Sequence, residues 1–338
     1  MKQLAYVEGV EPRWKDGGYA DRRSLQEMME QSRTSRAWYL GLRLVSVQIK
    51  NGGIWKDKDR LRLHNPQEQI PAIQASGVEH PSSFADCYHQ LADPVKRLPW
   101  TYNGMFRWWS GGPWSEARST GEFSGLWKRY DLTSAYRWAA TLGLPEPETY
   151  SVHTTMRDRP GLWIVEICDD IEGLPAVFRV PGPVVMSSEE IEGYHLRVKV
   201  IRGVTWTATK GTDYVEKTLT RLPCAKESGR AYWGRWIARD EVGCWTASGK
   251  SWRLPNRCLN LVWGWLIVGR VRLRVWQAAQ YAAHVYVDEV LVPHDLPTGY
   301  AIGDWHLKQE YPDGIIVRRT GCYGSRAGNM TMHTGAAA

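Results

Sequence analysis

The feature that most constrains this chain is a short segment in which two runs of β-branched residues flank a pair of carboxylates. The segment from His284 to Val292 reads HVYVDEVLV, with Asp288 and Glu289 near its centre. Valine-rich runs on both sides predict two strands, and a tight turn between them keeps the charged pair from being buried among the valines. We therefore expect a β-hairpin with Asp288 and Glu289 at its tip. Taken alone, an Asp-Glu turn is more often an ordinary exposed turn than a functional site.

A second carboxylate, Asp131, lies in the segment KRYDLTSAY from Lys128 to Tyr136. The pattern predicts a short strand that ends near Asp131, followed by a helix to Leu142, so the carboxylate would point outward beside free backbone N–H groups. Phosphoryl transfer uses two carboxylates from separate strands to hold two Mg²⁺ ions about 3.5–4 Å apart. Asp131 is by itself as readily a helix N-cap as a metal ligand.

The net charge of +7 is unevenly spread along the 338 residues. Residues 195–275 carry 16 Lys and Arg against five Asp and Glu, a net charge of +11, which leaves −4 for the rest of the chain. Such a basic segment predicts a polyanionic partner, with an ordinary charged surface as the alternative. The 19 tryptophans can stack on nucleobases, but we expect most of them to pack in the core.

Length and composition exclude several classes of protein. A chain of this length predicts one or two intimately packed domains. No stretch reaches the roughly 18 uninterrupted apolar residues of a membrane span, and the N-terminus lacks the apolar core of a secretory signal. The six cysteines show neither zinc spacing nor a disulfide pattern, so we expect free thiols and a cytoplasmic location, in the host if the protein is viral.

Local patterns predict several helices and strands. Ser187 to Glu190 reads SSEE, which is typical of a capping box at a helix start. Expected strands lie at 42–49, 163–167, 196–206 and 315–318, and expected helices at 24–32, 214–239 and, as one or two helices, 255–281. The rest of the first hundred residues has no clear periodicity, and it holds no D-x-E motif typical of a 3′-5′ exonuclease.

Taken in order, these segments resemble family B DNA polymerases of the protein-primed, phage-like branch. The stretch Tyr130 to Tyr136 is similar to motif A of that family, D-x-x-S-L-Y-P. The resemblance implies that Asp131 is a catalytic metal ligand, that Leu132 and Ser134 contact the nucleotide, and that Tyr136 is the steric gate against a ribose 2′-hydroxyl. Ala135 and Arg137 depart from the Leu and Pro of the motif.

The hairpin segment is similar to motif C, Y-x-D-T-D-S. Alignment of the apolar strand that follows places Asp288 on the second, essential Asp and Tyr286 on the first Asp. The resemblance then implies that Asp288 is a catalytic metal ligand and that Glu289 is an auxiliary one. A second register pairs Tyr286 with the Tyr of the family and leaves no second Asp.

A third segment, Asn260 to Gly264, resembles motif B, K-x-x-x-N-S-x-Y-G, the fingers helix that grips the incoming nucleotide. Asn256 stands at the Lys position and Leu261 at the Ser position, which puts the usual triphosphate grip in doubt. Arg253 and Arg257 lie four residues apart and could supply that grip from one helical face, or they could simply form a solvated face. The resemblance assigns nucleotide binding to these side chains and backbones: Arg253, Arg257, Asn260 and Gly264.

Weaker elements complete the order of motifs. The run WSGG at 109–112 is similar to the Y-x-G-G element, IGDW at 302–305 to the L-G-x-W element, and residues 318–323 lie where a K-x-Y primer motif would be, with Gly321 in the Lys position. The resemblance assigns DNA binding to Trp109, Gly111, Gly112, Trp305, Arg318, Arg319 and Tyr323.

The resemblance implies an α+β fold: a polymerase palm, which is an antiparallel sheet with helices on one face, with a helical fingers insertion and a small N-terminal region. We expect an N-terminal region of unknown role at 1–105, palm at 106–206, fingers at 207–268, palm again at 269–324 and a tail at 325–338. The short segment between Asn260 and Asp288 leaves no room for a strand-displacing insertion, and the 15 residues after Tyr323 leave little for a thumb.

The expected activity is that of a minimal DNA polymerase, a nucleotidyltransferase that uses two Mg²⁺ or Mn²⁺ ions. Its expected partners are a DNA primer-template, dNTPs and other replication or phage proteins, with no membrane. Without a thumb, binding should be weak and salt-sensitive, and synthesis distributive and without proofreading. Two alternatives stay open: a primase or template-independent terminal transferase, and a catalytically inactive palm that binds nucleic acid or acts in assembly. A Trp-rich carbohydrate-binding module is a third, which leaves the acidic pair unexplained.

Overall fold

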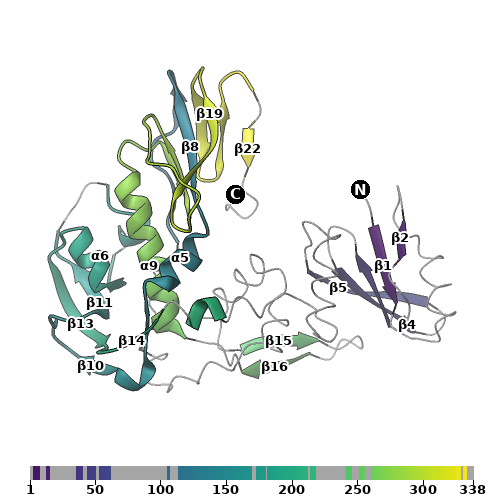
Figure 1. Ribbon diagram of the computed structural model, residues 1–338, viewed down its shortest axis with the longest axis horizontal. Helices are drawn as coiled ribbons and strands as arrows, with labels where there is room; N and C mark the ends of the chain where they lie inside the picture. The colour runs from purple at the N-terminus through teal and green to yellow at the C-terminus, as the bar shows by residue number, and fades with distance from the viewer. Residues whose placement is uncertain are drawn as a thin grey trace. The chain divides into compact units, whose positions relative to one another are not determined.

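In the computed structural model (Figure 1), the chain divides into two compact units, residues 1–95 with 217–258 and residues 96–216 with 259–338. The structure describes residues 105–106, 113–169, 173–179, 181–211, 214–217, 260–328 and 330–332, together with the backbone of the strands at 3–7, 13–15, 36–40, 44–50, 53–61, 241–245 and 251–255.

The first unit holds an antiparallel five-stranded sheet in the order β2-β1-β3-β4-β5. Its strands are β1 (Gln3–Val7), β2 (Arg13–Lys15), β3 (Arg36–Leu40), β4 (Leu44–Lys50) and β5 (Gly53–Leu61). The strand expected at 42–49 is confirmed as β4, but the absence of regular structure expected around it is wrong. A separate hairpin joins β15 (Glu241–Trp245) to β16 (Ser251–Pro255).

The second unit is built on an antiparallel five-stranded sheet in the order β19-β8-β18-β17-β6. The strands are β6 (Ser115–Ala117), β8 (Trp127–Leu132), β17 (His284–Tyr286), β18 (Glu289–Val292) and β19 (Trp305–Tyr311). The expected hairpin at 284–292 is therefore present as β17 and β18, and it pairs with β8, the strand that carries Asp131.

Two further four-stranded sheets belong to this unit. One has the order β22-β21-β20-β7, with β7 (Gly121–Phe123), β20 (Ile315–Arg319), β21 (Cys322–Ser325) and β22 (Met330–Met332). The other has the order β10-β13-β11-β12, with β10 (Ser151–His153), β11 (Gly161–Ile167), β12 (Val184–Ser187) and β13 (Val198–Thr205). Strands β9 (Leu144–Pro145) and β14 (Thr209–Lys210) form a short pair. The strands expected at 163–167, 196–206 and 315–318 are confirmed.

Three α-helices are described in full in this unit: α5 (Ala135–Thr141), α6 (Ser188–Gly193) and α9 (Leu261–Ala278), beside the short 3₁₀ turns η1 (Pro147–Thr149) and η2 (Ala176–Phe178). Helix α9 contacts α5, α6, β12 and β18, and so joins the five-stranded sheet to the sheet of β10 to β13 (Figure 1). The pattern at 255–281 thus yields one helix, and Pro255 lies instead in β16.

Helix α6 begins with the predicted capping box. The Ser187 hydroxyl accepts from the N–H of Glu190, and the Glu190 carboxylate accepts from the N–H of Ser187. The same carboxylate binds Arg272 of α9 at 2.6 Å, with both side chains buried. A neighbouring pair joins Arg270 to Glu189 at 2.8 Å. Gly269 lies against this region, where a Cβ atom would come within 2.4 Å of Glu190 Oε2.

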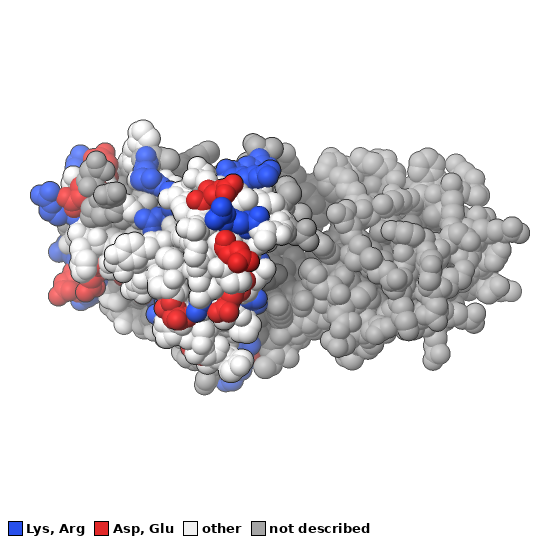
Figure 2. Space-filling model, turned by 90° about the horizontal axis from the view of Figure 1, so that it is seen from above, with Lys and Arg blue, Asp and Glu red and all other residues white. Residues whose placement is uncertain are grey.

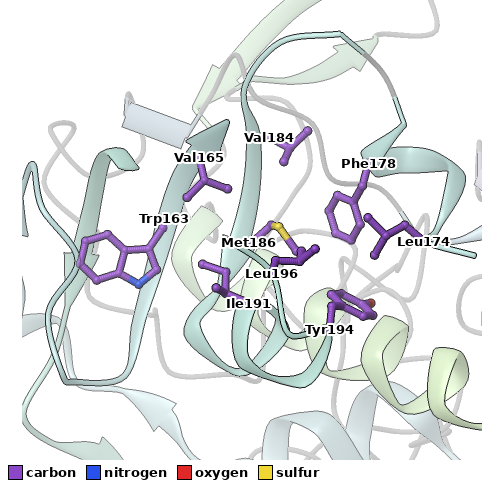
Figure 3. Packing of buried hydrophobic residues seen from close by; sticks show 9 residues of the cluster. All are labelled: Trp163, Val165, Leu174, Phe178, Val184, Met186, Ile191, Tyr194 and Leu196. Atoms are coloured by element: carbon purple, nitrogen blue, oxygen red, sulfur yellow. The ribbon is translucent and has the colours of Figure 1, made fainter. Parts of the chain in front are cut away.

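An apolar core lies between α6, α9 and the sheet of β10 to β13. Trp163 and Met186 come from paired strands, and Phe178 and Tyr194 pack edge to face against each other in the same cluster (Figure 3). Core packing is also where most described tryptophans lie, as expected. The fully or nearly fully buried ones are Trp114, Trp127, Trp163, Trp206, Trp263 and Trp305.

The described residues also bear on surface charge, on the cysteines and on membrane-spanning helices. On the face shown in Figure 2, basic and acidic side chains of the described residues lie among one another and do not form a patch of one sign. Part of the basic segment at 195–275 lies at 218–240, outside the described residues. Cys168 and Cys322 are free thiols, as expected. None of the helices among the described residues has the length and apolarity that a membrane crossing would need.

Candidate active site

A row of polar residues crosses one face of the five-stranded sheet. In antiparallel pairing, directly opposite residues carry their side chains on the same face, about 4.5–5.5 Å apart. One residue from each strand lies in this register, and from β19 to β6 the row is His306, Asp131, Glu289, Tyr286 and Ser115. The adjacent row, which points to the opposite face, holds the buried Tyr130, Val290 and Val285. One face of the sheet is therefore apolar at this level, whereas the other carries Asp131 in a polar surround.

The two predicted metal ligands, Asp131 and Asp288, come from neighbouring elements. Asp131 is the next-to-last residue of β8, and Asp288 lies in the turn between β17 and β18. The backbone N–H of Leu132 donates to the carbonyl of Asp288 at 2.8 Å, so the backbones of the two segments touch. The hairpin places the two segments together although they are far apart in the sequence.

The predicted position of Glu289 at the hairpin tip is wrong. The turn consists of Val287 and Asp288, and Glu289 is the first residue of β18, where it is 9% exposed. It lies directly opposite Asp131 in the strand pairing. The reason is the pairing of Tyr286 with Glu289, which moves the turn back by one residue along the chain.

Both segments bend through a residue with positive φ. Val287, just before Asp288, has φ 62, and Ser134, three residues after Asp131, has φ 50. This region is unfavourable for a β-branched residue, and backbone strain of this kind gathers at functional sites. The Val287 N–H donates to the carbonyl of Trp114 at 2.8 Å, and this bond holds the turn in place.

The Glu289 carboxylate is bound by Tyr323 and Arg129. The Tyr323 hydroxyl donates to Glu289 Oε1, and Arg129 Nε lies 3.8 Å from Glu289 Oε2. Burial, together with the negative charge of Glu289, raises the pKa of Tyr323 well above its usual value of 10.0. A metal-ligand role for Glu289 remains a prediction, and it would require the carboxylate to leave these two partners.

Asp131 has a basic partner that the sequence alone did not indicate. Lys308 Nζ on β19 lies 3.2 Å from Asp131 Oδ2, and both side chains are about one-third exposed, at 39% and 32%. His306, also missed, is the strand partner of Asp131. Arg129, two residues before Asp131 on the same strand, shares its face, and this two-residue spacing is the signal that could have found it.

The loop just before Trp305, the first residue of β19, docks on the segment after Asp131. The Thr133 N–H donates to the carbonyl of Asp304 at 2.9 Å, and the Gly303 N–H donates to the carbonyl of Thr133 at 2.8 Å. Gly303 has φ +83, and a Cβ atom there would come within 2.1 Å of the Trp138 ring, which explains the glycine. The elements expected around Asp131 and Trp305 are thus neighbours, although Trp305 itself is buried and pairs with Leu132.

The predicted nucleotide-binding residues fall in different places. Leu132 is buried at the end of β8, Ser134 is exposed just before α5, and Tyr136 is half-buried within α5. Asn260 caps α9: its side-chain oxygen accepts from the Trp263 N–H at 3.1 Å, and its amide nitrogen has no hydrogen-bond partner among the described residues. Gly264 lies buried in α9.

The remaining predicted binding residues lie in other strands or outside the described residues. Arg253 lies in β16, so the helical face expected to join it to Arg257 is wrong, because the local sequence SWRLP pairs as a strand with β15. Arg253 also belongs to the first unit, and the asparagine cap at Asn260 to the second. Arg318 and Arg319 are exposed on β20. Four positions lie outside the described residues: Trp109, Gly111, Gly112 and Arg257.

The carboxylates fit the needs of a magnesium site in part. No group of three or more His, Cys, Asp or Glu side chains in the described part of the chain is arranged to hold a metal ion. Mg²⁺ is, however, usually held by one or two carboxylates together with substrate phosphates and water. The Asp131 carboxylate, about one-third exposed, and the neighbouring Asp288 agree in number with that smaller donor set.

Comparison with known proteins gives a result for structure only. No protein-family model matches the chain, and no curated protein matches it in sequence. Solved structures of phi29 DNA polymerase do match. The complex with primer-template DNA and incoming nucleotides is 13% identical with a TM-score of 0.54, over 79% of this chain and 62% of the polymerase chain. The complex with single-stranded DNA is 14% identical with a TM-score of 0.54, over 79% and 60%.

The chain has a DNA polymerase-like fold. Its mixed architecture of antiparallel sheets and few helices agrees with the expected α+β class. The chain spans about three fifths of the length of the polymerase chains that it matches. At this identity the likeness concerns the fold and carries no residue roles.

Proposed function

We propose that this chain is a minimal DNA polymerase, a nucleotidyltransferase that adds dNTPs to a 3′-hydroxyl. The observation that carries the proposal is the contact between the Asp131 and Asp288 segments, made through the Leu132 N–H and the Asp288 carbonyl, on the polar face of a sheet in a DNA polymerase-like fold. Carboxylates on adjoining strand ends are the arrangement that phosphoryl transfer to a hydroxyl needs.

The proposed cofactors are two Mg²⁺ or Mn²⁺ ions held by Asp131 and Asp288. When bound with substrate phosphates, they supply positive charge at the attacking and leaving oxygens. Asp131 is about one-third exposed and lies in the polar row, so it can bind a cation without leaving the sheet. Glu289 stays with Tyr323 and Arg129, and in this position it places a second negative charge opposite Asp131.

The residues after Asp131 are proposed to contact the nucleotide. Ser134 is exposed at the start of α5, where its hydroxyl is open to a triphosphate. Tyr136 is half-buried two residues further on, and we propose that its ring blocks a ribose 2′-hydroxyl. Replacement of Tyr136 with Ala is expected to increase ribonucleotide incorporation in a primer-extension assay relative to deoxynucleotide incorporation. Unchanged sugar selectivity would contradict the role of the gate.

The proposed nucleic-acid contacts are basic and exposed. Arg318 and Arg319 lie on β20, next to the strand that carries Tyr323, and can neutralise primer-strand phosphates. Contacts that rest on phosphate charge are sequence-independent and weaken steeply with salt. We therefore propose distributive synthesis of short products, without proofreading.

The decisive experiment is extension of a labelled DNA primer on a template with Mg²⁺ or Mn²⁺ and dNTPs. Asp131→Asn and Asp288→Asn are each expected to reduce extension by about 10³-fold or more, because each removes a charged ligand from the site where charge develops. The matched control is Asp313→Asn, which alters an exposed Asp in the turn between β19 and β20 and should leave extension unchanged.

Extension that survives both substitutions would contradict the proposed ligands. A second candidate function is a nucleic-acid-binding palm without activity. One observation favours it: the Asp131 carboxylate already pairs with Lys308, and the Glu289 carboxylate already accepts a hydrogen bond from Tyr323. Undiminished DNA binding by the wild type with no extension under either metal would select that candidate. Extension that needs a primer but no template would select a terminal transferase.

A further inference from the structure

Lys308 owes its position to an irregularity in strand β19. The pairing of β19 with β8 runs from Trp305 to Leu307 in one register and resumes at Gln309 in another, so Lys308 is an extra residue opposite β8. Such a β-bulge bends the strand and re-aims a side chain, and bulges are over-represented beside active sites. The bulge is thus a local feature that can turn Lys308 toward Asp131.

The contact that results is an ion pair in the middle of the proposed site. Lys308 Nζ lies 3.2 Å from Asp131 Oδ2, and both side chains are partly exposed. Nearby, Arg129 and Tyr323 already bind Glu289. In this structure the charge of Asp131 is therefore balanced by Lys308, whereas Glu289 is bound by Arg129 and Tyr323.

An ammonium group and a divalent cation cannot both approach the same carboxylate oxygen closely. Each stabilises the carboxylate, and the like charges repel each other through a partly aqueous site. The partial exposure of Lys308 limits what its pair with Asp131 is worth, so a divalent ion can displace it. A long, flexible lysine side chain can swing away into solvent with little cost to the fold.

We infer that Lys308 is a built-in counter-ion of Asp131, which competes with divalent cations for this carboxylate and so sets the metal affinity of the site. The inference rests on the proposed function, because only there is Asp131 a metal ligand. It predicts that the free chain binds metal weakly and that loss of the lysine charge strengthens binding. Lys308 is therefore a residue that regulates the site and need not touch the substrate.

The test measures Mn²⁺ binding to the full-length chain, without nucleotide, from the loss of the electron paramagnetic resonance signal of free Mn²⁺. Lys308→Gln should lower the dissociation constant about three- to tenfold, the size expected when one unit charge is removed beside a partly solvated site. Lys308→Arg keeps the charge and should bind Mn²⁺ as the wild type does. Asp131→Asn should abolish the binding in every background.

The matched control is Lys199→Gln. Lys199 also pairs with a carboxylate, Glu166, at 2.9 Å, but it lies on β13 in a different sheet. The substitution changes the net charge by the same amount, so it reports any general effect of charge on Mn²⁺ affinity. It should leave the dissociation constant within about a factor of two of the wild type.

The outcomes separate the inference from the proposed function. Tighter binding by Lys308→Gln alone supports the counter-ion. Asp131-dependent binding that Lys308→Gln leaves unchanged or weakens overturns the counter-ion and leaves the proposed metal site standing. An equal gain in Lys199→Gln also overturns it. Absence of Asp131-dependent Mn²⁺ binding in every variant overturns the counter-ion, and primer extension by Asp131→Asn then decides separately whether the proposed function stands.

Discussion

Two ion pairs within the same unit are built in contrasting ways. Arg272 and Glu190 lie 2.6 Å apart with side chains only 2% and 0% exposed, between α9 and α6. Lys308 and Asp131 lie 3.2 Å apart, each with about a third of its side chain exposed, on the polar face of the five-stranded sheet. The first pair is closed to solvent and the second is open to it.

The surroundings of each pair decide what it can do. Glu190 also accepts the N–H of Ser187, and the Arg272 guanidinium lies 4.3 Å over the Phe178 ring, so both charges are fixed by further partners. A buried pair of this kind holds helices in one arrangement, because loss of either partner leaves an uncompensated charge. Lys308 instead reaches Asp131 from a bulge, and another cation can replace the Lys308 ammonium at the Asp131 carboxylate.

The largest effect is expected where the closed pair is broken. Arg272→Met should lower the free energy of unfolding by about 3–5 kcal/mol, because Glu190 would remain buried without its counter-charge. Denaturant unfolding followed by circular dichroism measures it. The control Arg197→Met removes a pair with Asp169, which lies 2.7 Å away, at an arginine that is 84% exposed, and should cost far less. Similar losses in both variants would show that burial does not distinguish these pairs.

An intermediate effect is expected at Tyr323, a buried residue whose hydroxyl donates to the buried Glu289 carboxylate. Tyr323→Phe should cost about 1–3 kcal/mol near neutral pH, because Glu289 loses its donor in a buried setting. The control is Tyr300→Phe, at a side chain that is 94% exposed, which should cost almost nothing.

The same variant has a pH signature. Burial and Glu289 raise the pKa of Tyr323 above its usual value of 10.0, so the stabilisation is fully present below pH 10 and is lost as the pH rises toward the folded value. The unfolding free energy of the wild type should therefore fall more steeply above pH 10 than that of Tyr323→Phe. Parallel alkaline profiles would mean that Tyr323 ionises as readily in the folded chain as in the unfolded one.

The sequence predicted local features better than contacts between distant segments. The capping box at Ser187 and Glu190 is a local signal, because the two residues that satisfy each other are three apart. The β17–β18 hairpin was predictable because valine-rich runs favour strands wherever they lie. The ion pair of Glu190 with Arg272 was not, since its partners are 82 residues apart and meet only through packing.

The polar face was predictable in its carboxylates but not in its register. Sequence alone favoured Asp288 and Glu289 as the turn, because a hairpin tip keeps the charged pair out of the valine-rich strands, whereas in the structure the turn begins at Val287, which takes positive φ. Long-range hydrogen bonds to Trp114 and from Leu132 impose that conformation and move Glu289 into the strand. The bulge at Lys308 carries no local signal either, so the partner of Asp131 could be found only from the paired strands.

The smallest effect is expected where the open pair is broken. Lys308→Gln should change the free energy of unfolding by less than about 1 kcal/mol, because an exposed pair gains little in water and the side chain is released from a fixed geometry. The matched control is Lys128→Gln. Lys128 lies on β8 of the same sheet, is only 12% exposed and pairs with Asp295, so its loss should lower the free energy of unfolding by more than that of Lys308. A loss for Lys308→Gln as large as that for Arg272→Met would make the pair with Asp131 a structural lock. If Lys308 were held that tightly, a divalent cation could not displace it from Asp131. The unfolding free energy and the Mn²⁺ affinity of Lys308→Gln therefore both test whether Lys308 is displaceable.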